Sequence, residues 1–341
     1  MTDKTEAART NLDRRTILAA ATATAGVGLA GTIAPASAAP RASSKITAQE
    51  HWVMKGDVKL YVYRKFMNGV KNKQRPILFL VHGSTFASRG SYDLNVPGRT
   101  GYSAMEHFAG LGYDVWTMDH EGYGFSARTA SNSGIQSGVE DLKAALPLVE
   151  KVTGQPSVMM FGESSGAIRA GAYTMAEPKR VSKLVLHAFT YTGKDAPEIE
   201  RRRKQADTYR ANPRRPFGMA QIENVFNRDV AGAGDPVVIK AMADFELKFG
   251  DSVPSGTYLD MAVNMPMVDP ARITCPVCLI RPEHDANESE AELHRFFREL
   301  ASNDKQFIKV HGMPHGGGMV GSQRARLWHL LHAFLSFPVV A

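Results

Sequence analysis

The sequence predicts an α/β fold: a mostly parallel, eight-stranded sheet flanked by helices, with a helical cap inserted after the sixth strand. Short, almost wholly apolar runs, typical of strands buried on both faces of a sheet, alternate with stretches whose apolar residues recur about every 3.6 positions. The chain has 341 residues, of which 43% are hydrophobic and 22% are charged, as in a globular protein. This composition excludes a disordered or collagen-like chain, and the two cysteines exclude a disulfide-stabilised scaffold.

Residues 1–38 are predicted to be an export signal rather than part of the fold. Arg14 and Arg15 precede a mildly apolar run rich in alanine, threonine and glycine, and small residues up to Ala38 complete a cleavage pattern. Paired arginines before such a run are typical of twin-arginine signal peptides, which this segment resembles. We expect an exported protein, periplasmic or secreted, without stable membrane insertion after cleavage, because no second long apolar stretch follows. An uncleaved membrane anchor is the alternative.

The sheet is expected to begin with a hairpin and to continue with six buried strands. Residues 51–54 and 60–66 flank Lys55-Gly56-Asp57, a turn sequence between two strand patterns. The six further strands are expected over residues 77–81, 115–118, 158–161, 184–186, 277–280 and 307–310.

Helices are expected over residues 103–109, 138–149, 166–176, 290–300 and 324–335. The alternation of strand and helix breaks once, in a charged segment with glycine and proline that is predicted to form several helices. We interpret residues 190–269 as a cap inserted into a core of residues 39–189 and 270–341. The aromatic residues of the cap are expected either to line an apolar acyl site or to pack within the cap.

The strongest functional motif is Gly162-Glu163-Ser164-Ser165-Gly166, which directly follows one buried strand and directly precedes a helix pattern. In this context a G-x-S-x-G sequence is typical of a nucleophile elbow. The glycines allow strand and helix to cross closely, because they have no Cβ. The Ser164 hydroxyl is then expected at a helix N-terminus, where partial positive charge favours a developing anion. The alternative is a structural serine in a glycine-rich turn.

Two further motifs follow strands in the same way. The strand over 77–81 ends in His82-Gly83-Ser84, and the strand over 115–118 ends in Asp119-His120-Glu121-Gly122-Tyr123-Gly124. With these three motifs in this order, residues 50–337 resemble the α/β-hydrolase superfamily. The resemblance implies a serine hydrolase in which His82-Gly83-Ser84 forms the oxyanion loop. Dehalogenases and epoxide hydrolases on this fold carry aspartate at the elbow, so Ser164 argues against both.

A serine hydroxyl needs a base to become an effective nucleophile at neutral pH. The resemblance implies a histidine after the last strand, where the sequence offers His311 and His315. We expect His315 to be the base, because it stands at the usual position in a glycine-rich loop. His311 lies nearer the end of the strand and is interpreted as structural.

The base in turn needs a carboxylate that fixes its tautomer and stabilises the imidazolium. The resemblance implies that this carboxylate follows the penultimate strand, which runs here into Arg281-Pro282-Glu283-His284-Asp285. We expect Asp285 to take the role, with Glu283 as the near alternative and Asp195 as a weaker one. The chain order Ser164, Asp285, His315 is the order expected on this fold.

Backbone amides are expected to hold the oxyanion that forms during acyl transfer. One should be the amide of Ser165, and the other that of Ser84, with Thr85 as the alternative. His82 is expected to organise this loop rather than to take part in the chemistry.

We predict a serine hydrolase that cleaves a carboxylic ester, or a related acyl bond, of a small molecule through an acyl-enzyme. A carbon–carbon bond hydrolase, lactonase, amidase or acyltransferase would use the same residues, and a non-catalytic binding protein is the alternative of another class. The sequence contains no zinc-protease, P-loop or dinucleotide-binding motif, so no cofactor and no metal are expected. Cys275 and Cys278 enter a strand with a spacing beyond disulfide reach and are predicted to be core thiols. The sequence does not specify an oligomeric state.

The formal net charge of +7 has a local source in the predicted cap. Between residues 201 and 215 a single acid, Asp207, opposes seven basic residues, namely Arg201, Arg202, Arg203, Lys204, Arg210, Arg214 and Arg215. We favour a solvated helix face as the interpretation, and a cap surface that attracts an anionic substrate is the alternative. The charge is therefore no indication of nucleic-acid binding.

Overall fold

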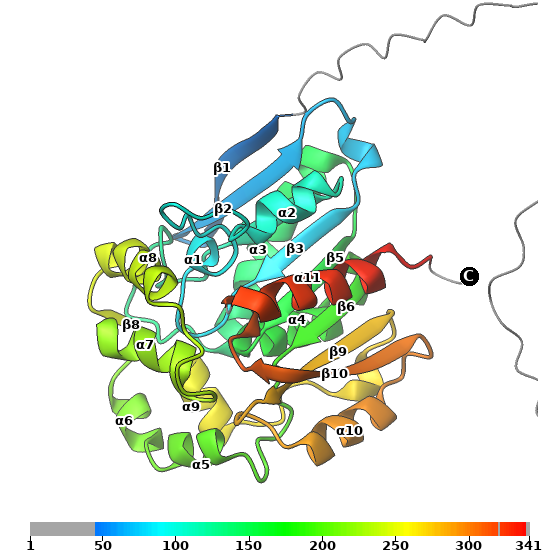
Figure 1. Cartoon of the computed structure of the whole chain (residues 1–341). Helices are drawn as coiled ribbons and strands as arrows, with labels where there is room; N and C mark the ends of the chain where they lie inside the picture. Colours follow the sequence, from blue (N-terminus) through cyan, green and yellow to red (C-terminus); the bar gives the residue numbers. More distant parts are fainter. Residues whose placement is uncertain (1–44, 320, 339–341) are drawn as a thin grey trace, which may run out of the picture. The chain divides into compact units, whose positions relative to one another are not determined.

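The computed structural model describes residues 45–319 and 321–338, which belong to one compact unit, and the predicted leader lies outside them. An eight-stranded sheet with the order β1-β2-β4-β3-β5-β6-β9-β10 forms its centre (Figure 1). Its strands are β1 (Ile46–Lys55), β2 (Val58–Met67), β3 (Ile77–Val81), β4 (Asp114–Met118), β5 (Val158–Glu163), β6 (Val181–His187), β9 (Val277–His284) and β10 (Lys305–Pro314). The predicted fold class is confirmed, and each expected strand is present.

The first two strands form a hairpin at one edge of the sheet. β1 and β2 pair antiparallel from Ile46 opposite Met67 to Lys55 opposite Val58, so this hairpin is longer than the sequence predicts. β2 also runs antiparallel to β4, whereas the remaining neighbours in the sheet are parallel. Parallel strands bring their carboxyl ends to one edge of a sheet, where binding and catalytic loops gather.

Helices cover both faces of the sheet (Figure 1). Those that pack on it are α2 (Ala104–Gly110), α3 (Ile135–Thr153), α4 (Ser165–Ala176), α10 (Glu290–Glu299) and α11 (Gly321–Ser336). α2 and α11 share one hydrophobic cluster with the sheet, and α3, α4 and α10 share another. All five correspond to helices that apolar spacing predicts.

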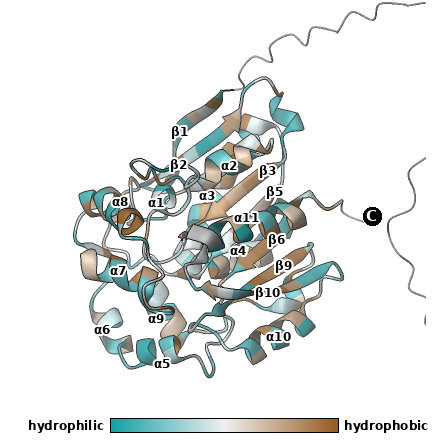
Figure 2. Cartoon of the chain, viewed as in Figure 1, coloured by the Kyte–Doolittle hydropathy of each residue, from teal (hydrophilic) through white to brown (hydrophobic). Residues whose placement is uncertain are grey.

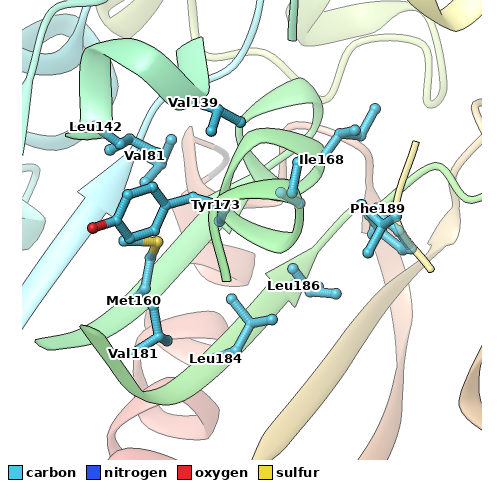
Figure 3. Packing of buried hydrophobic residues seen from close by; sticks show 14 of the residues in the cluster. Val81, Val139, Leu142, Met160, Ile168, Tyr173, Val181, Leu184, Leu186 and Phe189 are labelled. Carbon is cyan, nitrogen blue, oxygen red and sulfur yellow. The ribbon is translucent and has the colours of Figure 1, made fainter. Parts of the chain in front are cut away.

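The cluster around α4 fixes the helix that follows Ser164. In Figure 3, Ile168 and Tyr173 of α4 lie against Met160 of β5 and Leu186 of β6, and all four side chains are buried. In Figure 2 the central strands of the sheet are largely hydrophobic, whereas α5 is hydrophilic. Each buried apolar side chain of this size contributes about 1.5–3 kcal/mol, so α4 is held firmly on the sheet.

The segment between β6 and β9 forms the helical cap, beside one end of the sheet (Figure 1). It contains α5 (Pro197–Arg203), α6 (Ala206–Ala211), β7 (Arg214–Pro216), α7 (Met219–Asn227), α8 (Pro236–Glu246), β8 (Ser252–Pro254) and α9 (Gly256–Val263). The ribbon of β7 and β8 is not predicted by the sequence. Phe217 and Phe226 pack with Phe86 in a separate cluster under the cap, so these two aromatic residues are packing residues.

Two smaller predictions concern residues away from the cap. Cys275 is half-buried, Cys278 is buried, and both thiols are free. Within the part of the chain that the structure covers, no helix is both long enough and apolar enough to cross a membrane.

Candidate active site

Ser164 lies at the turn between β5 and α4, as the sequence predicts. Its backbone has φ 58° and ψ −127°, a conformation that side-chain-bearing residues rarely adopt. Such a residue costs about 1–3 kcal/mol and persists only where the surrounding structure determines it. Here the Ser164 amide donates to the carbonyl of His187 at 3.0 Å, and the buried faces of β5 and α4 fix the turn on both sides.

The glycines of the motif are required by close backbone contacts. A Cβ on Gly162 would lie 2.4 Å from the carbonyl oxygen of Gly166. A Cβ on Gly166 would lie 2.1 Å from the carbonyl oxygen of Val81 in the neighbouring strand β3. Both distances are far below any real carbon–oxygen contact, so the strand, the turn and the helix can meet only where these residues lack side chains.

The structure brings Ser164, His315 and Asp285 together in one chain of hydrogen-bond contacts. The Ser164 Oγ lies 2.9 Å from His315 Nε2, and His315 Nδ1 lies 2.9 Å from Asp285 Oδ1. With the ring proton on Nδ1, His315 donates to Asp285 and accepts from the Ser164 hydroxyl. Asp285 and His315 are each 6% exposed, so both contacts are shielded from water.

The environment of Asp285 keeps its carboxyl group ionised. Burial by itself would raise the pKa, but attraction and hydrogen bonding to His315, the Asn287 amide and nearby Arg228 lower the pKa of Asp285 to about 2. The Asn287 amide donates to Asp285 Oδ1 at 2.9 Å. An ionised carboxylate at this position favours protonation of the imidazole when that ring accepts a proton.

The three alternative residues do not lie at this chain of contacts. Glu283 accepts from the Gly312 amide at 2.8 Å, and its Oε2 lies 2.7 Å from His311 Nδ1. The His311 side chain is 89% exposed, so this pair is a surface contact at the ends of β9 and β10. Asp195 is an exposed residue on the segment before α5, with φ 56°.

The loop that carries Ser84 is held by a buried histidine. His82 Nδ1 lies 2.8 Å from the carbonyl oxygen of Gly83, and its Nε2 accepts from the His120 amide at 3.1 Å. Complete burial, with repulsion from His120 and Arg169, lowers the pKa of His82 well below its usual value, so this ring is neutral. His82 therefore organises the loop, which agrees with the expectation from the sequence.

Hydroxyl groups connect this loop to α4 and to the cap. Thr257 Oγ1 of α9 donates to Ser84 Oγ at 2.8 Å, and Ser84 Oγ donates to Ser165 Oγ at 2.7 Å. The backbone amides of Ser84 and Ser165 donate to no other described residue, so both are available to a ligand. Ser84 and Thr85 both line the pocket at Ser164.

The sequence gives no prediction for two residues that contact His315. Asp229, at the end of α7 in the cap, accepts from the His315 amide at 3.1 Å. The Asn287 amide nitrogen lies 2.9 Å from both ring nitrogens of His315, which places it over the ring face. Asn287 stands two residues after Asp285, and its proximity to that candidate is the one sequence signal that points to it.

Two adjoining cavities open at the site. The smaller one, called here the catalytic pocket, measures about 40 Å³ and is lined by Ser164, His315, the loop with Ser84, and the cap residues Arg202, Arg228 and Tyr258. The larger one, called here the cap cavity, measures about 1110 Å³. Thr85, Val225, Arg228 and Tyr258 line both, so the two cavities adjoin. Within the described residues, no group of three or more potential metal ligands occurs.

One protein family matches the part of the chain that carries this site. The model of the family described as "Serine aminopeptidase, S33" matches residues 97–317, which include Ser164, Asp285 and His315. No curated protein sequence matches the chain significantly.

Solved structures with the same fold are numerous, although their sequences differ strongly from this one. A thermophilic esterase from Thermogutta terrifontis has a TM-score of 0.60 and 19% identity, over 84% of this chain and 98% of that chain. The 2-hydroxy-6-oxo-6-phenylhexa-2,4-dienoate hydrolase from Rhodococcus sp. strain RHA1 has a TM-score of 0.61 and 14% identity, over 86% and 100%. An epoxide hydrolase from Vigna radiata has a TM-score of 0.60 and 15% identity, over 85% and 97%. At these identities the similarity concerns the fold alone.

Proposed function

The chain belongs to the serine aminopeptidase S33 family of α/β-hydrolases, and we propose that this hydrolase cleaves a carboxylic ester or a related acyl bond through an acyl-enzyme. The observation that carries the proposal is the chain of contacts from Ser164 through His315 to Asp285, with 2.9 Å at each step. These distances lie within the range that nucleophile activation by a base requires. The chain of contacts opens into the catalytic pocket, where an acyl carbonyl has room to lie.

In the proposed reaction the Ser164 Oγ attacks the carbonyl carbon while its proton passes to His315 Nε2. Asp285 stabilises the imidazolium that results, and the amides of Ser165 and Ser84 donate to the oxyanion. When the tetrahedral intermediate collapses, the bond to the leaving oxygen breaks and that oxygen takes the proton from His315. Water, deprotonated in turn by His315, then attacks the acyl-enzyme and releases the acid and the Ser164 hydroxyl.

The neighbours in fold include proteins named as an esterase, a 2-hydroxy-6-oxo-6-phenylhexa-2,4-dienoate hydrolase and an epoxide hydrolase. A serine at the elbow supports acyl transfer rather than epoxide opening in this chain, because the resemblance assigns aspartate to that position in epoxide hydrolases. We propose ester cleavage as the activity because a small-molecule ester needs no residue beyond those in contact here.

Replacement of Ser164 tests this proposal. Labelling by a fluorophosphonate and hydrolysis of p-nitrophenyl esters should both be lost in Ser164→Ala, with turnover reduced by about 10⁴-fold or more. Ser182→Ala is the matched control, because Ser182 is an exposed residue at the opposite end of neighbouring strand β6. A correctly folded wild-type protein that is neither labelled nor active on any ester would contradict the proposal and favour a binding protein.

We also propose that the hydrolase is exported and acts outside the cytoplasm. The paired arginines Arg14 and Arg15 before the apolar run support this proposal, together with the small residues up to Ala38. The export proposal is independent of the catalytic one, because it concerns residues outside those that the structure describes.

A further inference from the structure

The walls of the two cavities at Ser164 carry an excess of arginine. The cap cavity is lined by Arg201, Arg214, Arg215 and Arg228, against the carboxylates of Glu198 and Asp251. Arg202 lines the catalytic pocket together with Arg228. Five arginines thus line the two adjoining cavities, and all of them belong to the cap.

A single carboxylate serves three of these arginines. Glu198 lies 2.6 Å from Arg201, 3.2 Å from Arg202 and 3.6 Å from Arg228. This concentration of positive charge, which outweighs the effect of partial burial, lowers the pKa of Glu198 to about 2. Asp229 lies 3.5 Å from Arg228 as well, so two carboxylates face three guanidinium groups and the site keeps a net positive potential.

Arg214 and Arg215 bond to neutral oxygens instead. Arg214 Nε donates to Ser252 Oγ at 3.0 Å, and Arg215 Nη2 donates to the Ser84 carbonyl at 2.7 Å. Neither forms an ion pair with a carboxylate in the described part of the chain. The Nε atoms of Arg202 and Arg215 are buried and have no described hydrogen-bond partner. A buried N–H without an acceptor is costly, and an anion bound between these arginines would supply one.

Tyr258 lies between two of these arginines and is affected by their positive charge. The guanidinium carbons of Arg215 and Arg202 lie 4.0 Å and 4.2 Å from the centre of its ring. Burial opposes ionisation of the phenol, but attraction to Arg215, Arg202 and Arg228 lowers the pKa of Tyr258 to about 7. Tyr258 lines both cavities, so the field extends from the catalytic pocket into the cap cavity.

We propose that the substrate is an acyl compound that carries a second, anionic group, a carboxylate or a phosphate, which the cap arginines bind while Ser164 attacks the acyl carbonyl. This inference rests on the proposed function, because it assumes that the reacting carbonyl lies at Ser164. Guanidinium groups suit both anions, since they donate parallel hydrogen bonds to two oxygens. The same charges disfavour a substrate with a free, protonated amino group at this end of the pocket.

Matched esters test the proposal in the wild-type enzyme. The probes are 4-nitrophenyl hydrogen adipate, its neutral methyl ester of the same length, and 4-nitrophenyl 5-phosphonopentanoate. We expect kcat/KM to be at least tenfold higher for one of the charged esters than for the neutral one, because charge-assisted hydrogen bonds to arginine are strong. The charged ester that is preferred identifies the anion as carboxylate or phosphate. 4-Acetoxy-3-nitrobenzoate and its methyl ester repeat the comparison with the charge on the alcohol half.

Variants of the cap distinguish binding from a general loss of activity. Arg202→Gln should remove most of the preference, because KM should rise more for the charged ester than for the neutral one. Arg214→Gln provides a second test if the buried Arg202 variant fails to fold. Arg210→Gln is the matched control, because Arg210 is an exposed residue of the same basic stretch and lines neither cavity. Arg215 is not replaced, since it contacts the Ser84 carbonyl.

A binding measurement separates this inference from the proposed function. Titration calorimetry on Ser164→Ala should give at least tenfold tighter binding of a charged ester than of its neutral partner. Equal affinities within both probe pairs would overturn the inference, whether or not the wild-type enzyme hydrolyses esters. Selective binding of the charged ester without hydrolysis by the wild-type enzyme would instead leave the inference standing and refute the proposed function.

Discussion

Two carboxylates, Glu283 and Asp285, stand two positions apart at the end of β9 and differ completely in what they contact. Asp285 is buried against His315, whereas Glu283 lies near the surface beside His311. The resemblance to the α/β-hydrolases favours Asp285. It does not exclude Glu283, because both residues stand at the end of the same strand. Contact with the ring of His315 distinguishes them.

Replacing these two carboxylates one at a time tests the role of Asp285. Asp285→Asn should lower kcat by about 10³–10⁴-fold with a small change in KM, because the amide favours the wrong tautomer of His315. Since the pKa of Asp285 is about 2, its carboxylate stays ionised from about pH 5 to pH 9, so protonation of Asp285 does not contribute to the comparison in this range. Glu283→Gln is the control and should stay within about twofold of the wild type. A larger loss of kcat in Glu283→Gln than in Asp285→Asn would transfer the role to Glu283.

At the scale of elements, we favour a solvated helix face for the basic stretch between residues 201 and 215, and the structure shows that this interpretation fails for Arg202. A solvated helix face describes Arg201 and Arg203, whose side chains are 49% and 36% exposed, but Arg202 between them is 2% exposed. Successive helical residues point about 100° apart, so one of three adjacent arginines faces inward whenever the helix packs on another. Because all three are arginine, apolar periodicity carries no information about which one.

The central strands of the core, in contrast, are predictable from the sequence because most of their residues are apolar. β3 and β4 are buried along their whole length, and their apolar composition is visible without a structure. The ribbon of β7 and β8 escapes prediction because each strand has three residues and ends in a proline, Pro216 and Pro254. Ser164 and His315 are predictable because motif and chain order identify them. Asp229 is not, because a long-range contact alone brings it to His315, and for Asn287 the only signal is its place two residues after Asp285.

One cap element carries a buried acid whose ionisation should affect stability. Glu246 at the end of α8 accepts from the Ala87 amide at 3.0 Å, and a Cβ on Gly90 would lie 2.0 Å from its Oε1. Complete burial, with repulsion from Asp119, raises the pKa of Glu246 well above its usual value. An acid with a higher pKa in the folded state binds its proton more tightly there, so this group lowers stability as the pH rises above about 4.5.

Glu246→Gln should therefore be more stable than the wild type at neutral and alkaline pH. We expect Tm to rise by about 2–4 °C near pH 7, which corresponds to about 1 kcal/mol, and the difference to disappear below about pH 4.5. Glutamine keeps the acceptor for Ala87, so the contact between α8 and the loop survives. Thermal unfolding across pH measures the effect, with Glu140→Gln as control, because the Glu140 side chain is 45% exposed. An advantage that grows on acidification would contradict the prediction.

At the scale of the whole molecule, the charge of the chain is unevenly distributed. The formal net charge is +7, and the largest local excess lies between residues 201 and 215. Arg201, Arg202, Arg214 and Arg215 line the cavities at Ser164, so part of this charge belongs to the site. The proposed leader adds little charge but determines where the folded enzyme is delivered.

The export proposal is tested by a conservative change in the leader. Replacing both Arg14 and Arg15 by lysine keeps the charge and should retain the protein in the cytoplasm at full length. Cell fractionation and the mass of the exported form measure this, and the wild-type protein should begin at Ala39. Arg9→Lys is the control and should be exported normally. Export of the double lysine variant at the wild-type level would refute the twin-arginine route.

The position of the cap in the chain has a consequence for how such enzymes diverge. The cap leaves after β6 and returns before β9, and these strands are neighbours in the sheet, so exchanging it changes no strand pairing. Genes for this fold can therefore acquire new substrate ranges by replacing one contiguous stretch of coding sequence, while the reaction itself is inherited unchanged. Contacts between cap and core limit such exchange, and among them Thr257 and Arg215 bond to Ser84. A transplanted cap that lacks both would no longer support the loop that carries Ser84.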